Sequence, residues 1–313
     1  MTIHSRLSGW SWLLLLAPLV CVESPQAGSN EWFATSPGGA GDPASAPRSW
    51  PGQQFRQMAA SDAAGNVAIG STSFDGFAWT VLVHKYSPTG QLQWAQRIQS
   101  NSGSDIQFAV EASLVLDFTP AGDVAVAFPE TAGHPQLGPL GVAMLSGSDG
   151  SLLWRSAVTY GGVDVLVRPF ALAVDSTGDV VVLAAQANEF LTVKLDGANG
   201  ALAWNGLPEG IAVWQQSGER PLAIAIDAQD DIVICGRSGD DTATIKYHGD
   251  TGLPFWNALP NGAALIDFGL SGTGPSDLAI DADGDIVLSA AGAQFAAVAF
   301  GGDTGLPLWT RLT

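Results

Sequence analysis

The densest group of acidic side chains in this sequence is Asp281-Ala282-Asp283-Gly284-Asp285. Alternating carboxylates ahead of a tight turn can wrap Ca²⁺, because this ion prefers several oxygen ligands. An EF-hand loop would also need a bidentate Glu at its last position, which is Gly292 here. The same residues suit a plain turn, in which the first Asp accepts backbone N–H bonds and the Gly takes the left-handed conformation. Two interpretations therefore stay open: Ca²⁺ bound by Asp281, Asp283 and Asp285, or a turn without metal. A weaker second candidate for a metal site is the group Asp227, Asp230 and Asp231.

Other residue types that could do chemistry are few and scattered. The histidines form no pair at metal-ligand spacing, and they are His4, His84, His134 and His248. His84 and His248 stand at the ends of apolar stretches beside tyrosines, which favours a surface position for both. The sequence has no nucleophile elbow, no phosphate-binding loop and no dinucleotide fingerprint. We therefore assign no catalytic residue.

A recurring turn organises the rest of the sequence. Gly stands four residues before Trp in five copies, whose tryptophans are Trp94, Trp154, Trp204, Trp256 and Trp309. Upstream of each Trp, an apolar stretch leads to an Asp, then a short turn that usually holds Gly, then a second apolar stretch. The first Asp residues of these turns are Asp62, Asp117, Asp175, Asp227 and Asp281. The copies recur about every 53 residues, a period typical of propeller blades rather than of helical solenoids.

One copy can be divided into strands. Its apolar stretches are Phe170–Val174, Asp179–Ala184, Phe190–Leu195 and, after a turn at Asn199-Gly200, Ala201–Trp204. Short apolar stretches separated by glycine-bearing turns predict four antiparallel strands. Strands that are apolar on both faces become stable when sheets stack face to face. The sequence thus predicts an all-β fold, a β-propeller of about five four-stranded antiparallel blades over residues 58–313, with the five tryptophans wedged between neighbouring blades.

The Thr-Gly-x-x-x-Trp turn resembles the tryptophan-docking motif of quinoprotein, or PQQ-like, β-propellers. The Asp-x-x-Gly-Asn/Asp-Val turn resembles that of bacterial repeat propellers of the secreted or lipoprotein type. The docking motif begins with Ala and Asp, of which this chain keeps only Ala299 and Asp196, in different copies. Active quinoprotein dehydrogenases are larger, many with two adjacent cysteines over the quinone and Ca²⁺ in the central funnel. Here the two cysteines, Cys21 and Cys235, are far apart in sequence. PQQ is therefore not expected, and apart from the Ca²⁺ left open above no cofactor is expected. The resemblance favours the non-catalytic propellers that serve as binding platforms.

The charge of the chain limits its partners. The formal net charge is −18, from 30 acidic and 12 basic residues. Such a surface repels phosphate backbones and anionic lipid headgroups. Nucleic acid is therefore not an expected partner.

The N-terminal residues predict export. Residues 1–21 have a short polar start and an apolar core that is too short for a permanent membrane anchor but suits a signal peptide. Cys21 directly after that core resembles the lipidated Cys of bacterial lipoproteins, although Val20 and Pro18 depart from that pattern. The alternative is an ordinary cleaved signal. Residues 22–57 are rich in Gly, Pro, Ala and Ser and predict a tether, in which Trp32 belongs either to a stray strand that closes a ring or to exposed chain.

The sequence thus predicts an exported, monomeric β-propeller of the bacterial cell envelope, lipid-anchored or secreted, that binds a protein or an envelope polymer without catalysis. Its only contact with the membrane would be a lipid on Cys21. Propeller loops often carry ligand-contacting groups, and the acidic residues between the strands are Glu111, Glu130, Glu189, Glu209 and Glu219. The alternative is a quinoprotein-like or glycan-active enzyme with acids in its central channel.

Overall fold

The computed structural model describes residues 58–74, 79–98, 114–130, 138–161, 167–187, 189–215, 220–268, 274–291 and 295–312. The chain divides into residues 1–43 and 44–313, and every described residue lies in the second unit. The predicted signal (1–21) with Cys21 and the predicted tether (22–57) with Trp32 lie outside the described residues. Within those residues, no helix has the length and apolar character needed to cross a membrane.

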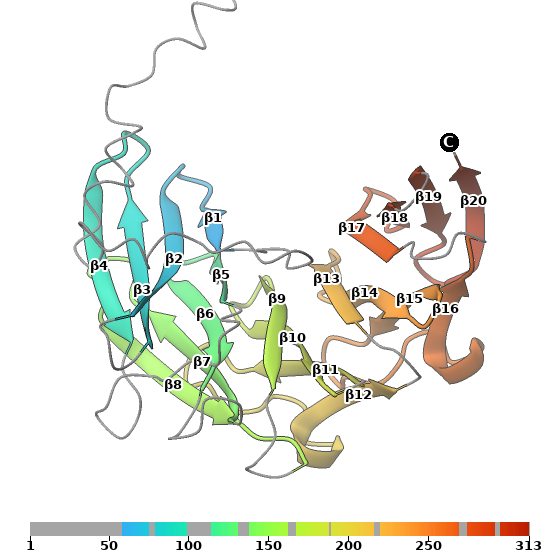
Figure 1. Ribbon diagram of the computed structural model, residues 1–313, viewed down its shortest axis with the longest axis horizontal. Helices are drawn as coiled ribbons and strands as arrows, with labels where there is room; N and C mark the ends of the chain where they lie inside the picture. Colours follow the sequence, from blue (N-terminus) through green and yellow to red (C-terminus); the bar gives the residue numbers. More distant parts are fainter. Residues whose placement is uncertain are drawn as a thin grey trace, which may run out of the picture. The chain divides into compact units, whose positions relative to one another are not determined.

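The described strands form five antiparallel sheets of four strands each, which confirms the all-β prediction (Figure 1). Sheet 1 contains β1 (Ala59–Ser61), β2 (Val67–Phe74), β3 (Trp79–Tyr86) and β4 (Leu92–Ile98); sheet 2 contains β5 (Val115–Phe118), β6 (Val124–Pro129), β7 (Leu140–Leu145) and β8 (Leu152–Val158). Sheet 3 contains β9 (Arg168–Val174), β10 (Val180–Gln186), β11 (Glu189–Leu195) and β12 (Ile211–Gln215); sheet 4 contains β13 (Arg220–Ile226), β14 (Ile232–Ser238), β15 (Asp241–Tyr247) and β16 (Ala263–Ile266). Sheet 5 contains β17 (Gly274–Ile280), β18 (Ile286–Ala291), β19 (Phe295–Phe300) and β20 (Pro307–Leu312).

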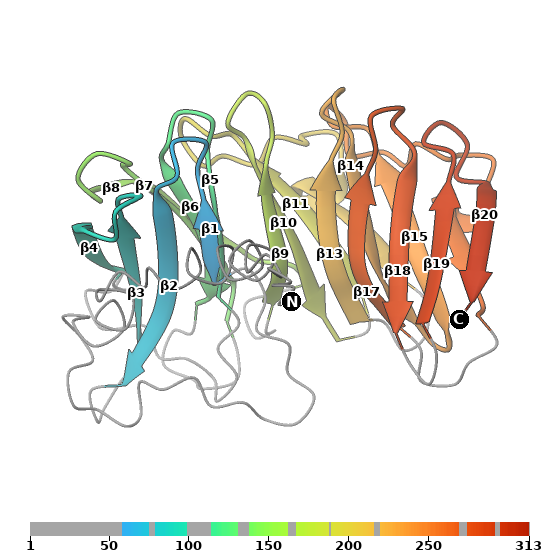
Figure 2. The same cartoon turned by 90° about the horizontal axis from the view of Figure 1, so that it is seen from above.

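The first strands of the sheets are the innermost ones, and they contact one another in chain order, from β1 to β5, β9, β13 and β17 (Figure 2). A separate hydrophobic core fills the space between each successive pair of sheets. Within β10, Val182 packs towards sheet 2 while Val181 packs towards sheet 4. This double burial explains why the central strands are continuous apolar runs instead of alternating apolar and polar residues. Among the described strands, β1 and β17 share no extensive contact.

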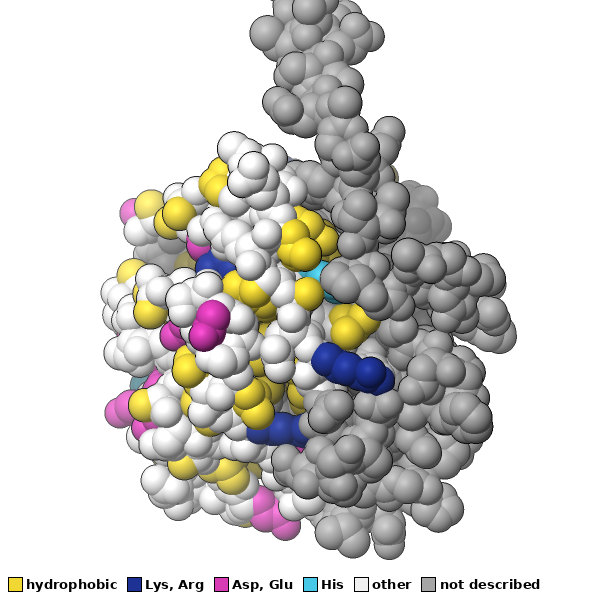
Figure 3. All heavy atoms as spheres, turned by 90° about the vertical axis from the view of Figure 1, so that its left-hand side faces the viewer, with side chains coloured by type: hydrophobic (Ala, Val, Ile, Leu, Met, Phe, Trp, Pro, Cys, Tyr) yellow, Lys and Arg dark blue, Asp and Glu magenta, His cyan; other side chains and the backbone are white. Residues whose placement is uncertain are grey.

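Few charged side chains lie on the face drawn in Figure 3, which looks at the side of Figure 1 where β4 lies. Hydrophobic side chains are scattered there among uncharged polar ones. This agrees with a chain in which only 13% of the residues are charged.

Four tryptophans lie at the seams, a word used here for the interface between two successive sheets. Each indole Nε1 donates a hydrogen bond to a glycine carbonyl of the next sheet: Trp94 to Gly147 (3.1 Å), Trp154 to Gly197 (2.7 Å), Trp204 to Gly249 (3.0 Å) and Trp256 to Gly302 (3.0 Å). All four are buried. Trp309 differs, because it is 41% exposed and no described sheet follows β20.

In sheets 2 to 5, the glycine four residues before the Trp packs against the indole of the preceding sheet. Gly200 has φ 74° and lies on Trp154, and a Cβ built on it would be 2.4 Å from a ring carbon. Gly150, Gly252 and Gly305 meet Trp94, Trp204 and Trp256 in the same way. A side chain at this position would therefore be strained twice, by the left-handed backbone and by the ring.

The outermost strands of sheets 3 and 4 differ from the prediction. Ala201–Trp204 forms no strand, and only an isolated bridge joins Leu202 to Leu195. The chain then turns through a 3₁₀ segment, η1 (Pro208–Gly210), before β12 pairs with β11. Sheet 4 repeats this detour with η2 (Pro260–Gly262) before β16.

The Gly–indole contact predicts unequal effects of two glycine substitutions. Gly200→Ala should lower the free energy of unfolding by about 2–5 kcal/mol, since it combines left-handed strain with overpacking against Trp154. Gly178→Ala is the matched control: Gly178 also has positive φ (94°), but nothing lies within 4 Å of its added Cβ. It should cost only about 1–2 kcal/mol. Urea unfolding of both variants measures the difference, and equal losses would contradict packing against the indole.

Candidate functional site

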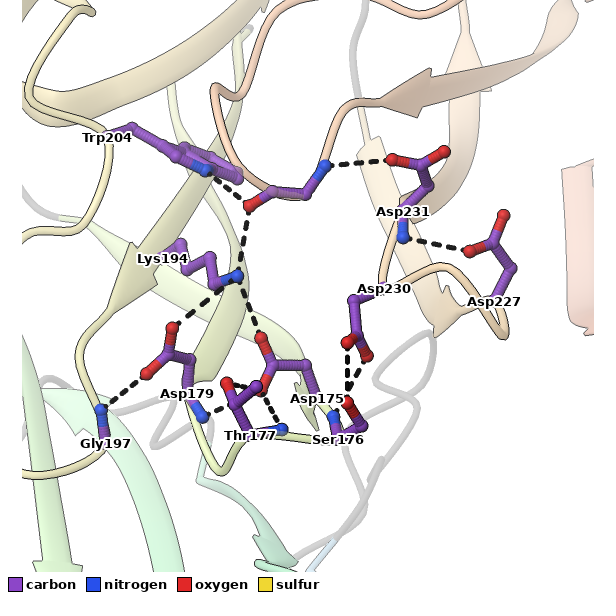
Figure 4. Close-up of polar contacts among 11 residues, drawn as sticks. Asp175, Ser176, Thr177, Asp179, Lys194, Gly197, Trp204, Asp227, Asp230 and Asp231 are labelled. Carbon is purple, nitrogen blue, oxygen red and sulfur yellow. Dashed lines mark hydrogen bonds and ion pairs between the residues drawn. The ribbon is translucent and has the colours of Figure 1, made fainter.

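A buried lysine links the turn of sheet 3 to sheet 4. Lys194 Nζ lies 2.8 Å from Asp175 Oδ2 and 3.6 Å from Asp179 Oδ2, and it donates to the Gly249 carbonyl at 3.0 Å (Figure 4). The Gly249 oxygen is the one that also accepts the indole bond of Trp204. Burial by itself would raise the pKa of Asp175, but the hydrogen bonds from Lys194, Thr177 and the Asp179 backbone outweigh it and hold that pKa below its ordinary value.

The second acid of each turn orients the glycine that accepts the indole bond. Asp231 Oδ1 accepts the Gly249 N–H at 3.0 Å, and Asp179 Oδ1 accepts the Gly197 N–H at 2.9 Å. Asp123 and Asp285 make the same bond to Gly147 and Gly302. A polar chain therefore runs through each of these seams, from an Asp through a Gly peptide to the Trp of the preceding sheet.

The lysine is present at three of the four seams. Lys85 donates to the Gly147 carbonyl at 2.8 Å, and Lys246 donates to the Gly302 carbonyl at 3.4 Å. Lys246 also lies 2.8 Å from Asp227. In sheet 2 the position of Lys194 is held by Met144, and the position of Asp175 is held by Thr119. The cation and the first acid of the turn are thus absent together.

Four of the predicted turn residues occupy the first position of the turn, where their carboxylates accept backbone N–H bonds. The acceptors are Asp62, Asp175, Asp227 and Asp281. Asp117 needs a correction, because it lies inside β5 and Thr119 takes the first turn position. Burial raises the pKa of Asp117, while its bond from the Phe118 N–H acts in the opposite direction.

Two of the acids proposed as calcium ligands bind backbone groups. Asp281 Oδ1 accepts the N–H groups of Asp283 and Asp285, and Asp285 Oδ1 accepts the Gly302 N–H. Over the described part of the chain, no three His, Cys, Asp or Glu side chains are grouped so that they could hold a metal ion. The contacts of Asp281 and Asp285 thus belong to the turn and to the strand pairing of the same sheet.

In the second candidate group, Asp227 and Asp231 bind Lys246, whereas Asp230 binds Ser176 N and Oγ of sheet 3. Because Asp230 binds a residue of the neighbouring sheet, the three carboxylates do not share one partner.

The histidines take different positions. His84 is buried in β3 with 4% exposure, and burial lowers its pKa, so its predicted surface position is wrong. His248 Nδ1 lies 3.9 Å from Asp231 Oδ1, and its ring packs against Phe255. His4 and His134 lie outside the described residues.

An open groove lies on the outer side of the seam between sheets 2 and 3. Its volume is about 480 Å³, and residues 156–159 at the end of β8 line one side. Gly200, Leu202 and Glu209 line the other side, which the detour of sheet 3 supplies. Ser156 Oγ donates to the Gly200 carbonyl at 2.5 Å, so this hydroxyl is engaged by a carbonyl oxygen and not by a base.

One carboxylate that lines the groove, that of Glu209, and a second one, that of Glu189, act on Tyr160. Glu209 Oε2 accepts the Gly161 N–H at 3.3 Å. Burial, the charge of Glu189 and a hydrogen bond with it, and the charge of Glu209 raise the pKa of Tyr160, in that order. Glu189 and Glu209 therefore lie near one phenol, although they are 20 positions apart in the sequence (209 − 189).

The comparisons with known proteins concern the fold. No protein-family model matches the chain, and a search among curated proteins finds no match. Among solved structures, the Dos1 propeller aligns with a TM-score of 0.52 at 10% identity, over 80% of this chain and 58% of that one. This chain has a β-propeller fold.

Two other solved structures are less similar. A quinohemoprotein alcohol dehydrogenase, ADHIIG from Pseudomonas putida HK5, gives a TM-score of 0.48 at 12% identity, over 80% of this chain and 51% of that one. A protein of unknown function from Bacteroides caccae gives 0.46 at 14% identity, over 82% of this chain and 80% of that one. Within the propeller, the five sheets are blades, and the seams described above are blade interfaces.

Replacing Lys194 tests the coupling between the cation and its acids. Lys194→Met should cost about 3–5 kcal/mol, because it leaves Asp175 buried without its counter-charge. The double variant Lys194→Met with Asp175→Thr copies the pair that sheet 2 already uses. It should recover about 1–3 kcal/mol of that loss, which is the usual coupling between contacting residues. Denaturant unfolding of the two single variants and the double variant gives the coupling, and strictly additive losses would contradict the described contact.

Proposed function

We propose that this protein is an exported β-propeller that works by binding, as a platform in the bacterial cell envelope, and that it is of the secreted or lipoprotein repeat type. Its partner is a protein or an envelope polymer. The carrying observation is the groove of about 480 Å³ beside β8, which is lined by hydroxyls, a carboxylate and apolar side chains on a frame of docked blades. A cleft in which a few fixed polar groups accompany apolar side chains is typical of binding sites.

The positions of the buried charges also support a binding role. Lys194 and Lys246 are engaged with acids and with a carbonyl of the next blade, so these charges hold the blades together. Arg155 Nη2 lies 2.8 Å from Glu130, where both side chains are nearly buried. The described buried charges thus have structural partners, and the groove at the blade edge is left for recognition.

A capture experiment tests the proposed function. The immobilised mature protein should retain a defined component of an envelope extract, saturably and in competition with free protein. Purified protein mixed with Ca²⁺, quinone and a redox dye should leave the dye unreduced. Dye reduction that depends on the quinone, or the release of sugars from an envelope glycan, would contradict the proposal and favour the enzyme.

Export by a lipoprotein signal makes a separate prediction. Cys21→Ala should move the protein from the membrane fraction to the soluble fraction, because the lipidated residue is lost. Immunoblots of fractionated cells measure this, with Cys235→Ala as the matched control because Cys235 is buried in β14. An unchanged distribution of the Cys21 variant would contradict the lipid anchor.

A further inference from the structure

The groove beside β8 lies at the seam between blades 2 and 3. There β8 runs without interruption from Leu152 to Val158, while the facing blade makes the detour through η1. Blade 4 makes the same detour with η2, but the strand that would face it in blade 3 is itself interrupted after Leu202. The meeting of one continuous edge strand with one detour produces the cavity.

The lining of the groove is chemically mixed. Leu202 contributes an apolar side chain, while Ser156 and Thr159 contribute hydroxyls and Glu209 a carboxylate. An apolar side chain near a carboxylate fits a ligand side chain whose stem is hydrocarbon and whose head is a cation.

The carboxylate of Glu209 favours a ligand with a positive charge. Glu209 is exposed, one of its oxygens accepts the Gly161 N–H, and the second oxygen is left to meet a ligand. The charges of Glu189 and Glu209 both act on Tyr160 beside the groove. Among the described residues, neither of these glutamates is ion-paired. Within the part of the chain that the structure describes, no cation pairs with the negative charge beside Tyr160.

The backbone at Glu209 gives an independent indication. Glu209 has φ 54°, in the left-handed region, and Asn261 holds the equivalent position in η2 with φ 53°. Asn adopts this conformation more readily than Glu does. Blade 3 thus keeps a carboxylate at a position where the backbone alone would favour Asn.

The β8 edge favours a peptide over a small cation. Residues 156–159 are consecutive, and β8 is the outermost strand of its sheet. An extended peptide can pair with such an edge while one of its side chains enters a neighbouring pocket. We propose that the groove binds a lysine side chain of an extended peptide segment, with the stem on Leu202 and the ammonium at Glu209. This inference rests on the proposed binding function and specifies its partner as a protein.

The test uses the full mature chain and a pair of short peptides, acetyl-Thr-Val-Lys-Val-Thr-amide and the same peptide with norleucine in place of Lys. In NMR titrations, the lysine peptide should shift the resonances of Thr159, Gly200 and Leu202 first. Norleucine should bind about tenfold more weakly, because it lacks the charge-assisted bond to Glu209. Glucosamine, which carries an ammonium group but has no peptide backbone, should shift the same signals only at much higher concentration.

The variants separate charge from fold. Glu209→Asn should weaken the lysine peptide about tenfold and leave norleucine binding unchanged, since Asn already occupies the matching left-handed position at 261. Asn261→Gln is the matched control and should change neither peptide. Unfolding temperatures of both variants show whether the fold is kept.

Equal binding of the two peptides, shifts outside the groove, or tight binding of glucosamine would overturn the inference. So would a Glu209→Asn variant that is still folded and binds the lysine peptide as well as the wild type does. The failure of the proposed function looks different, because there the wild-type protein would capture nothing from the envelope extract. If the Glu209→Asn variant captures the same component as fully as the wild type does, the proposed binding function is supported and the proposed lysine site is contradicted.

Discussion

The hydrogen bond from a tryptophan Nε1 to a glycine carbonyl of the next blade is the contact on which the rest of this structure depends. It occurs at all four described seams, at 2.7 to 3.1 Å, and each indole is buried as it donates. A buried indole N–H without an acceptor would destabilise the folded state, because the donor gives up its hydrogen bond to water and gains none in return. Each seam therefore needs a carbonyl at one fixed place, which the turn of the next blade provides.

Several sequence features follow from that need. The accepting peptide must be held, and an Asp of its own blade does so by accepting the N–H of the same glycine. The indole must lie flat on a backbone without a side chain, so a second glycine with positive φ stands four residues before the next Trp. Lys194 and Lys246 join the carbonyl to the acids of their own turns. Blade 2 omits Lys and its first Asp together, which shows that the Trp–Gly bond persists without the ion pair.

The repeat could be predicted from sequence because its residues recur at fixed spacing, and the Gly-x-x-x-Trp interval is one half of a physical contact. The residues that complete this contact lie in another blade, and a single repeat does not show which residues of two blades meet. The roles of Lys194 and Gly197 could therefore not be predicted. Asp117 was misassigned because the turn in blade 2 starts with Thr119, two residues later, and Thr can accept the same backbone bond through its hydroxyl. The detour in blades 3 and 4 had a signal, the repeated Trp-Asn-x-Leu-Pro-x-Gly at 204–210 and 256–262. The groove could not be predicted, because it lies between a blade whose outermost strand is continuous and a blade whose outermost strand is interrupted.

The blades thus form a frame whose internal charges are used at the seams, while recognition is proposed at one blade edge. The central claim, that indoles lock the blades, can be tested by the hydrogen exchange of the tryptophan indole N–H groups, followed by NMR in the native protein. The account predicts slow exchange for Trp94, Trp154, Trp204 and Trp256 and fast exchange for Trp309, which is 41% exposed. Equal and fast exchange of all five would contradict it.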